Sequence, residues 1–241
     1  MCRPVQLSLL VAAAFTATAT RAQIAKNGAR YVFHIKTHAG MKVVYLIRAN
    51  FTPPPAAQAP AKPISVVTPV VGVVTGITKD VSTVDFTFGP PLLNGQREGE
   101  ARSLRMKVDG QGRTVGAPAP GLENLFGNLP TRPLKVGDSY TNKQTISFAG
   151  IPLTVDAHYV FVGEKTVHSH HVADFTISIS GSGSLPGPQG GASPFRINGS
   201  GAMRVGADDG LTAHSSANIT AVIGQNSPPT RLKVSTTIDR K

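Results

Sequence analysis

Hydrophobic and polar residues alternate along most of the chain with a period of two, which is the pattern of half-buried β-strands. In the segment YVFHIKTH, the residues Tyr31, Phe33 and Ile35 fall on one face and polar residues fall on the other. The same alternation runs through LTVDAHYVF (153–161), ADFTISIS (173–180), LTAHSSANITAVI (211–223) and RLKVSTTID (231–239). Each segment therefore predicts a strand with one face in the core and one face in water.

Helical patterns are nearly absent, and only the segment PGLENLFGNL predicts a short helix, near residues 120–128. The remaining pattern predicts an all-β protein of about ten to twelve antiparallel strands. Because a twisted sheet of that width does not stay flat, we expect a single large meander curled into a barrel or half-barrel. A two-sheet sandwich produces the same alternation and is the alternative.

Two stretches interrupt the alternation without a change of composition around them. The Pro-rich stretch at 53–63 predicts an extended surface loop, because proline donates no backbone hydrogen bond. The Gly/Ser/Pro-rich stretch at 181–194 predicts a flexible loop between two strands. We therefore expect one all-β domain over residues 23–241, with no internal repeat.

The first 22 residues have the features of a secretory signal peptide, namely an early arginine, an apolar stretch and small residues before Gln23. Cleavage is expected after Ala22, which predicts an exported protein, periplasmic or extracellular; a retained membrane anchor is the alternative. The only cysteine, Cys2, lies in this segment. The mature chain would then have no disulfide, no thiolate nucleophile and no later transmembrane segment.

The charge is basic, with 24 Lys and Arg against 13 Asp and Glu. Removal of Arg3 and Arg21 leaves 22 basic residues and a net charge of about +9. This charge is compatible with acidic polymers or an anionic membrane surface as partners. Specific nucleic-acid binding is not supported, since the sequence has no dense basic run and no aromatic residues interleaved with basic ones.

The sequence contains no recognised catalytic constellation. It lacks the G-x-S-x-G turn of serine hydrolases, and its acidic residues indicate no convergent pair of the kind glycosidases use. The adjacent Asp208 and Asp209 are typical of a turn between strands rather than of a calcium loop. We therefore predict no enzymatic activity and no cofactor.

The segment TVHSHHVADF contains the best metal-ligand candidates, His168, His170 and His171. If the apolar faces of the flanking strands point the same way, the connecting loop has an odd number of residues. A three-residue loop of His168, Ser169 and His170, or a five-residue loop, satisfies this condition. A hairpin tip is therefore favoured over a zinc site, since no cysteine or nearby acid completes four ligands. Four further histidines are expected on polar strand faces: His34, His38, His158 and His214.

The segment NLPTRPLKVGDSYTNKQ predicts a turn that leads into a strand. In it, Pro130 and Pro133 would hold the chain extended, Gly137 would permit a tight turn, Asp138 would accept backbone hydrogen bonds and Tyr140 would anchor the strand. The segment resembles a motif, LP-x-x-P-[LV]-K-V-G-D-S-[YW], of an uncharacterised family of exported bacterial all-β proteins. The resemblance covers roughly residues 120–223 and implies an exported all-β fold but no reaction. Tyr140 stands where tryptophan is more usual in that family.

Two hypotheses for function follow from these patterns. The first is a non-enzymatic exported protein whose curled sheet shelters an apolar small molecule or lipid in the cell envelope. The alternative is a basic envelope module that binds acidic polymers or anionic lipid surfaces.

Overall fold

The computed structural model describes residues 24–52, 63–116, 123–126, 128–148, 151–186, 192–224 and 230–241. The predicted signal peptide and nearly all of the predicted Pro-rich loop lie outside these residues. No helix in the described ranges has the length and apolar character needed to cross a membrane.

The described chain is almost entirely β-structure, which confirms the predicted fold class. Its strands are β1 (Ile24–Asn27), β2 (Arg30–Phe33), β3 (Lys42–Thr52), β4 (Ile64–Thr78), β5 (Val81–Phe88), β6 (Leu92–Leu93), β7 (Gln96–Arg97), β8 (Arg102–Val108), β9 (Ser139–Phe148), β10 (Ile151–Val167), β11 (His170–Pro186), β12 (Ala192–Gly206), β13 (Thr212–Ile223) and β14 (Thr230–Arg240). A single turn of 3₁₀-helix, η1 (Glu123–Phe126), stands where the sequence predicts a short helix.

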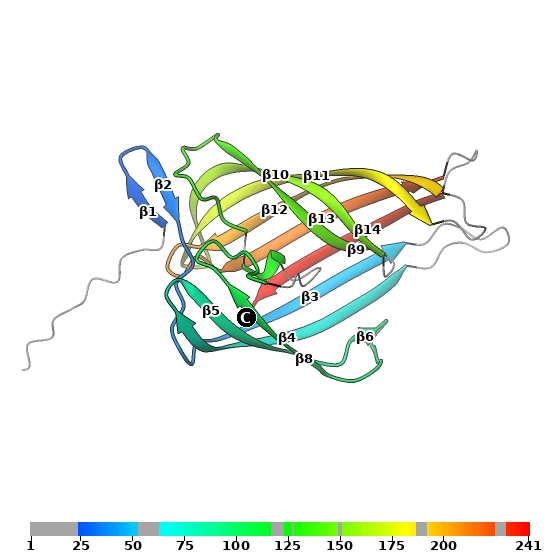
Figure 1. The fold of residues 1–241 in the computed structure, drawn as a ribbon, viewed down its shortest axis with the longest axis horizontal. Coiled ribbons are helices and arrows are strands. Elements are labelled where there is room, and N and C mark those ends of the chain that lie inside the picture. Colours follow the sequence, from blue (N-terminus) through cyan, green and yellow to red (C-terminus); the bar gives the residue numbers. More distant parts are fainter. Residues whose placement is uncertain are drawn as a thin grey trace, which may run out of the picture.

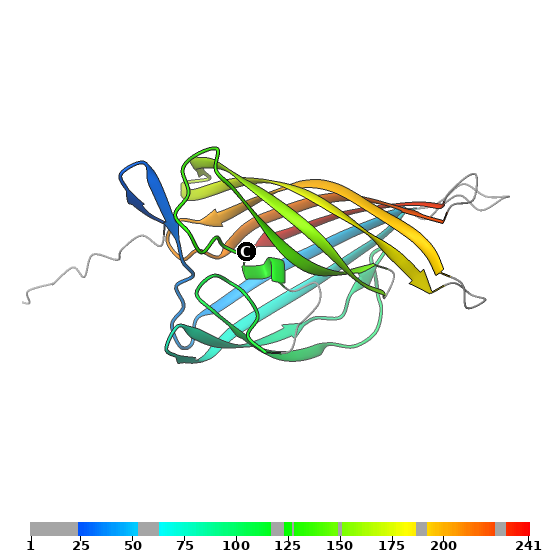
Figure 2. The same ribbon diagram turned by 45° about the horizontal axis from the view of Figure 1, so that its top comes forward.

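Twelve strands form one antiparallel sheet, and β1 and β2 form a separate hairpin. From β9 the sheet runs through β10, β11, β12, β13, β14, β3 and β4 to β5 and β8, so that the C-terminal strand β14 joins the two halves of the chain. The sheet curls until β9–β11 lie opposite β3–β5 (Figures 1 and 2). In the described residues no backbone pairing connects β8 to β9, so the sheet is not a closed barrel.

One end of the curl is filled by side chains that do not belong to the sheet. From β2, Tyr31 and Phe33 pack edge-on against Phe161 of β10, at ring-centroid distances of 4.9 and 5.3 Å. Residues 123–126 and 128–134, called here the bridging segment, place Leu125 and Phe126 in the core. Figure 2 shows η1 inside the curl, between its two sides.

The bridging segment is tied to both sides of the curl. Tyr45 of β3 donates a hydrogen bond from its hydroxyl to the carbonyl of Leu125, at 3.0 Å. On the opposite side, the side-chain amide of Asn142 in β9 donates to the carbonyl of Asn128, at 3.0 Å. The segment is also held by backbone hydrogen bonds between Leu129 and Gln111 and between Leu134 and Tyr31, so it spans the curl without pairing β8 to β9.

The predicted flexible loop at 181–194 is wrong at both of its ends. Strand β11 continues through Pro186 and β12 begins at Ala192, with Gly183 paired to Phe195 and Ser184 paired to Pro194. A Cβ atom at Gly183 would lie 2.7 Å from the ring of Phe195. Glycine is therefore used here for close packing inside a strand, and the composition alone suggested a loop.

Candidate functional site

The three clustered histidines lie at the tip of the β10–β11 hairpin, and all three are exposed. Val167 pairs with His170, so the connection has only two residues, His168 and Ser169. Both adopt positive φ angles, 48° and 68°, as a type I′ hairpin turn requires. The predicted hairpin tip is present, but the predicted odd-numbered loop is wrong.

A β-bulge explains the difference. Phe161 pairs with Phe175, but the next pair joins Gly163 to Asp174, so Val162 is an extra residue in β10. The apolar residues on the far side of the bulge pair in the predicted register, as with Ala157 and Ile179. Because Val162 is an extra residue in β10, it shifts the pairing beyond it by one position, and the loop has two residues instead of three. The sequence signal is Gly163, a glycine inside an alternating strand with a φ of 136°.

The histidine turn lines a hollow of about 470 Å³ together with the β12–β13 turn and the end of β14. Its lining includes His168, His170, His171, His214, Arg204 and Asp208. Among the described residues, no three histidine, cysteine or acidic side chains are placed to hold a metal ion. The structure therefore offers His168, His170 and His171 as surface groups around a hollow, without a metal-ligand geometry.

The other histidines do not converge. His34 lines a different hollow near Gly110, and His158 of β10 lies 3.1 Å from the hydroxyl of Thr141 on β9. His38 is exposed near β3, and its Nδ1 lies 3.3 Å from the carbonyl of Ala39. Only His214 joins the three clustered histidines around one hollow.

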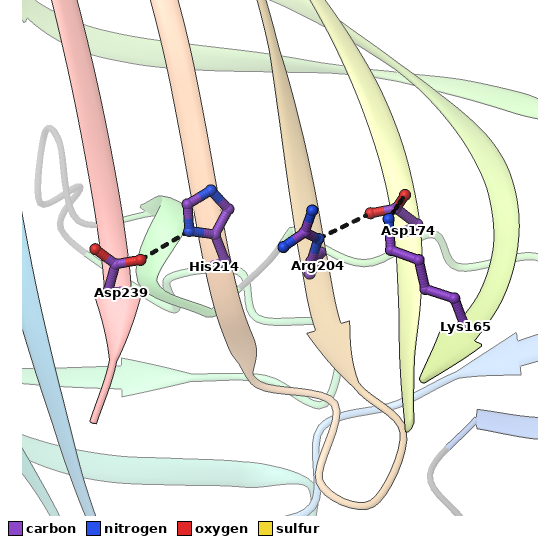
Figure 3. A network of polar contacts seen from close by, with 5 residues as sticks. All are labelled: Lys165, Asp174, Arg204, His214 and Asp239. Atoms are coloured by element: carbon purple, nitrogen blue, oxygen red, sulfur yellow. Dashed lines mark hydrogen bonds and ion pairs between the residues drawn. The ribbon is translucent and has the colours of Figure 1, made fainter. Parts of the chain in front are cut away.

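A row of charged side chains crosses the outer face of the sheet near this hollow (Figure 3). Asp174 of β11 pairs in register with Arg204 of β12, which pairs with His214 of β13, which in turn pairs with Asp239 of β14. Asp174 binds Lys165 and also Arg204, whose Nε lies 3.4 Å away. The row therefore has its two bases in the middle and one acid at each end, so that each acid lies beside a base.

The carboxylate of Asp239 is held by two bases. Nδ1 of His214 lies 2.7 Å from Oδ1, and Nη1 of Arg48 lies 2.6 Å from Oδ2. Partial burial by itself would raise the pKa of Asp239, but the hydrogen bonds and positive charge of His214 and Arg48 outweigh it and hold this pKa below its ordinary range. Other aspartates are paired in the same way, among them Asp85 with Arg105, Asp109 with Arg113 and Asp209 with Arg240.

The turn motif before β9 has a structural role. Gly137 adopts a φ of 89°, and the carboxylate of Asp138 accepts the backbone N–H of Lys135 at 3.0 Å, directly before β9 begins. Gly137 also donates its N–H to the carbonyl of Phe161 at 2.8 Å. Pro130 is buried and Pro133 is half-buried. The motif therefore fixes the start of an edge strand against β10.

The concave face of the sheet is apolar and is filled unevenly. Near the histidine turn, Phe161, Phe175 and Met203 are buried. On the side of this face formed by β3, β14 and β13, six inward-facing apolar residues are only partly buried, and they are called here the inner patch: Ile47, Phe51, Ala217, Ile219, Ile223 and Val234. A completely filled core would bury these side chains as fully as Phe161, Phe175 and Met203, so the inner patch is a partly accessible apolar surface.

Small residues explain why the inner patch is not filled. One row of paired residues crosses the concave face as Ala49, Thr236, Ala217, Gly201, Ile177, Tyr159 and Tyr140. Four of these seven are alanine, threonine or glycine, and they occupy the neighbouring strands β3, β14, β13 and β12. A Cβ atom at Gly201 would lie 2.0 Å from the carbonyl oxygen of Ser216, so the strands approach closely here. Short side chains therefore occupy the β3, β14, β13 and β12 positions of the row, whereas the rings of Tyr159 and Tyr140 occupy the β10 and β9 positions.

Two tyrosines and a glutamine form a polar cluster at the β9 end of this row. The rings of Tyr140 and Tyr159 stack at 4.8 Å with an angle of 6° between their planes. The buried amide of Gln144 donates to the Tyr159 hydroxyl at 2.5 Å, whereas the buried Tyr140 hydroxyl has no hydrogen-bond partner in the described part of the chain. Burial raises the pKa of Tyr159 to about 12 and that of Tyr140 well above its usual value, so both remain protonated donors.

Sequence reasoning placed Tyr140 in the core but missed the cluster around it. In β9 the inward positions include Tyr140, Asn142 and Gln144, so the strand carries polar residues where the other strands carry apolar ones. A sequence pattern ordinarily assigns polar residues at alternate positions to the outer face, so an inward-facing polar cluster is not predicted from it.

Comparison of the chain with protein-family models and with curated proteins finds no match. The candidate site is therefore defined by its geometry: a concave apolar face that is only partly buried over the inner patch and is bordered by stacked tyrosines.

Proposed function

We propose that the chain is an exported, non-enzymatic binding protein that holds an apolar or amphiphilic small molecule on the concave face of its sheet. The observation that carries this proposal is the incomplete burial of the inner patch, whose apolar side chains face the inside of the curl. Covering such a surface is favourable by roughly 25 cal/mol for each Å² removed from water. The short side chains of Ala49 and Ala217, and Gly201, do not cover the inner patch, and a bound guest molecule would cover it.

The charge distribution supports this function better than binding of acidic polymers. In the charged row on the outer face, Asp174 and Asp239 each pair with basic neighbours and offset their charge. A polyanion is bound best by a contiguous cluster of unpaired lysines and arginines. The described outer row has paired charges instead.

The proposal is tested by titrating the purified protein, after delipidation in organic solvent and refolding, with the neutral fluorescent probe N-phenyl-1-naphthylamine. We expect saturable fluorescence enhancement with one site per chain. The variant Ala217→Leu fills the inner patch and should weaken probe binding at least fivefold. The matched control, Ser216→Leu, adds the same side chain to the outer face of the same strand and should leave binding unchanged.

Two results would contradict the proposed binding function. Absence of saturable binding by the wild-type chain would contradict the proposal. Equal weakening by both leucine variants, with circular dichroism showing that both are folded, would place the probe elsewhere on the molecule and would also contradict it.

A further inference from the structure

Charged side chains are segregated from the part of the concave face that holds the inner patch. Three rows of paired residues cross this region, beginning on β3 at Ile47, Ala49 and Phe51. Two of these rows reach β9 and the row from Ile47 ends at Phe161 of β10, and every inward-facing side chain along them is uncharged. The chain is nevertheless basic, with 24 Lys and Arg in total.

The charges of these same strands lie on the outer face. Arg48 of β3, Lys233 of β14 and Arg196 of β12 each alternate with inward-facing apolar neighbours. At the end of β14, Arg240 pairs with Tyr45, outside the three rows, and its guanidinium is bound by Asp209 at 2.5 Å. An ionised guest that lay across the three rows would therefore find no described strand side chain of opposite charge.

Hydrogen-bonding groups are nevertheless present on this surface. Thr236 is the second residue of the middle row, is half-buried and faces inward between Ala49 and Ala217. Ser215 lies beside it in the next row, and Asn142 ends the row that begins at Phe51. Hydroxyl and amide groups bind an uncharged carbonyl or hydroxyl, whereas an ionised carboxylate taken into an apolar site requires a cation to offset its desolvation.

We propose that the guest is a neutral chain-like lipid, such as a fatty ester or alcohol, and that the concave face discriminates against ionised fatty acids. This inference rests on the proposed function. The distance along the sheet from β9 to β13 is four strand spacings, or roughly 19 Å, which suits an extended acyl chain lying across the strands.

The experiment uses two fluorescent probes with the same chain, cis-parinaric acid and its methyl ester, titrated into the full protein at pH 8 and pH 4. At pH 8 the ester should bind at least tenfold more tightly than the ionised acid. At pH 4, where the carboxyl group is largely protonated, the two affinities should agree within about twofold, because a carboxylic acid titrates near pH 4 to 5. This comparison needs no variant and so does not depend on the stability of any mutant.

A variant adds a test of location. Thr236→Lys places a cation in the middle row and should raise the affinity for the acid at pH 8 about tenfold relative to the ester. The matched variant Ser235→Lys adds the same charge to the outer face of β14, where Ser235 pairs with Asn50 and Asn218, and should leave the ratio unchanged.

The outcomes separate the two proposals. Equal binding of acid and ester at pH 8 would overturn the inference about charge while leaving the binding function in place. An equal response of the two lysine variants would show that the acid binds on the outer surface and would likewise overturn it. Failure of both probes and of N-phenyl-1-naphthylamine would contradict the binding function itself.

Discussion

The imidazole Nδ1 of His214 lies 2.7 Å from Oδ1 of Asp239, while Arg48 holds the second oxygen of the same carboxylate at 2.6 Å. These contacts join three neighbouring strands, β13, β14 and β3, at the point where the two halves of the chain meet. The carboxylate of Asp239 is therefore an ionic connection between the halves.

The variant Asp239→Asn should lower the free energy of unfolding at pH 7 by about 1 kcal/mol, since the side chain is partly exposed and solvent screens the pair. The folded-state pKa of Asp239 is lowered, so its contribution is present above the unfolded value of about 3.9 and is lost as the pH falls through the folded value. Urea unfolding at pH 7 and pH 3 measures this dependence. The difference between wild type and variant should shrink at the lower pH.

The control for this prediction is Asp85→Asn. The hydrogen bond and charge of Arg105 lower the pKa of Asp85, but both side chains are more exposed than that of Asp239. We expect a smaller loss of stability from this variant. A difference at Asp239 that stayed constant from pH 7 to pH 3 would show that packing, and not ionisation, stabilises the site.

Ser169→Gly should stabilise the β10–β11 hairpin. Ser169 has a φ of 68°, in the left-handed region where a side chain is unfavourable and glycine is not. The free energy of unfolding should rise by about 0.5 to 1 kcal/mol in urea denaturation. The matched change Ser178→Gly, in the middle of β11, should lower it by a similar amount, because glycine weakens a regular strand. Destabilisation by Ser169→Gly would rule out the two-residue turn.

Gly201→Ala should destabilise the sheet by about 3 kcal/mol, because the new Cβ atom would lie 2.0 Å from the carbonyl oxygen of Ser216 and the strands would have to separate. The control is Gly76→Ala, where the new Cβ has no neighbour within 4 Å. That variant should change stability by less than about 0.5 kcal/mol. Thermal unfolding of both variants measures the difference, and equal effects would argue against close strand approach at Gly201.

Tyr45→Phe should lower the free energy of unfolding by about 1 to 2 kcal/mol, since it leaves the buried carbonyl of Leu125 without its donor. Burial raises the pKa of Tyr45 above its usual value, so the hydroxyl is a donor throughout the ordinary pH range. Hydrogen exchange should show faster exchange in residues 123–126 and 128–134 than elsewhere. Tyr31→Phe serves as the matched control, and exchange that increased equally in both variants would contradict this role of Tyr45.

The fold class was predictable because alternation determines which face of each strand is buried. The apolar positions of 153–161 and 173–180 predict that Ala157 and Ile179 point the same way, and these two residues are paired. The two-residue turn was not predicted, because the bulge at Val162 shifts the pairing by one residue without disturbing the apolar pattern on either side.

The candidate site was less predictable than the fold. Exposure of the inner patch depends on which small residues become neighbours across strands, and Ala49, Thr236, Ala217 and Gly201 are brought together by pairing between segments far apart in sequence. The place of Gln144 beside Tyr159 likewise follows from the β9–β10 register. Local patterns carry no information on such pairings.

The bridging segment connects the two sides of the curl. Its ties to the two sides, through Tyr45 and Asn142, are side-chain hydrogen bonds to backbone carbonyls. Leu125 and Phe126 are fully buried, and backbone hydrogen bonds join Leu129 to Gln111 and Leu134 to Tyr31. Since no strand pairing joins β8 to β9 in the described residues, this segment is a cross-brace between two sheet edges that would otherwise be free to part.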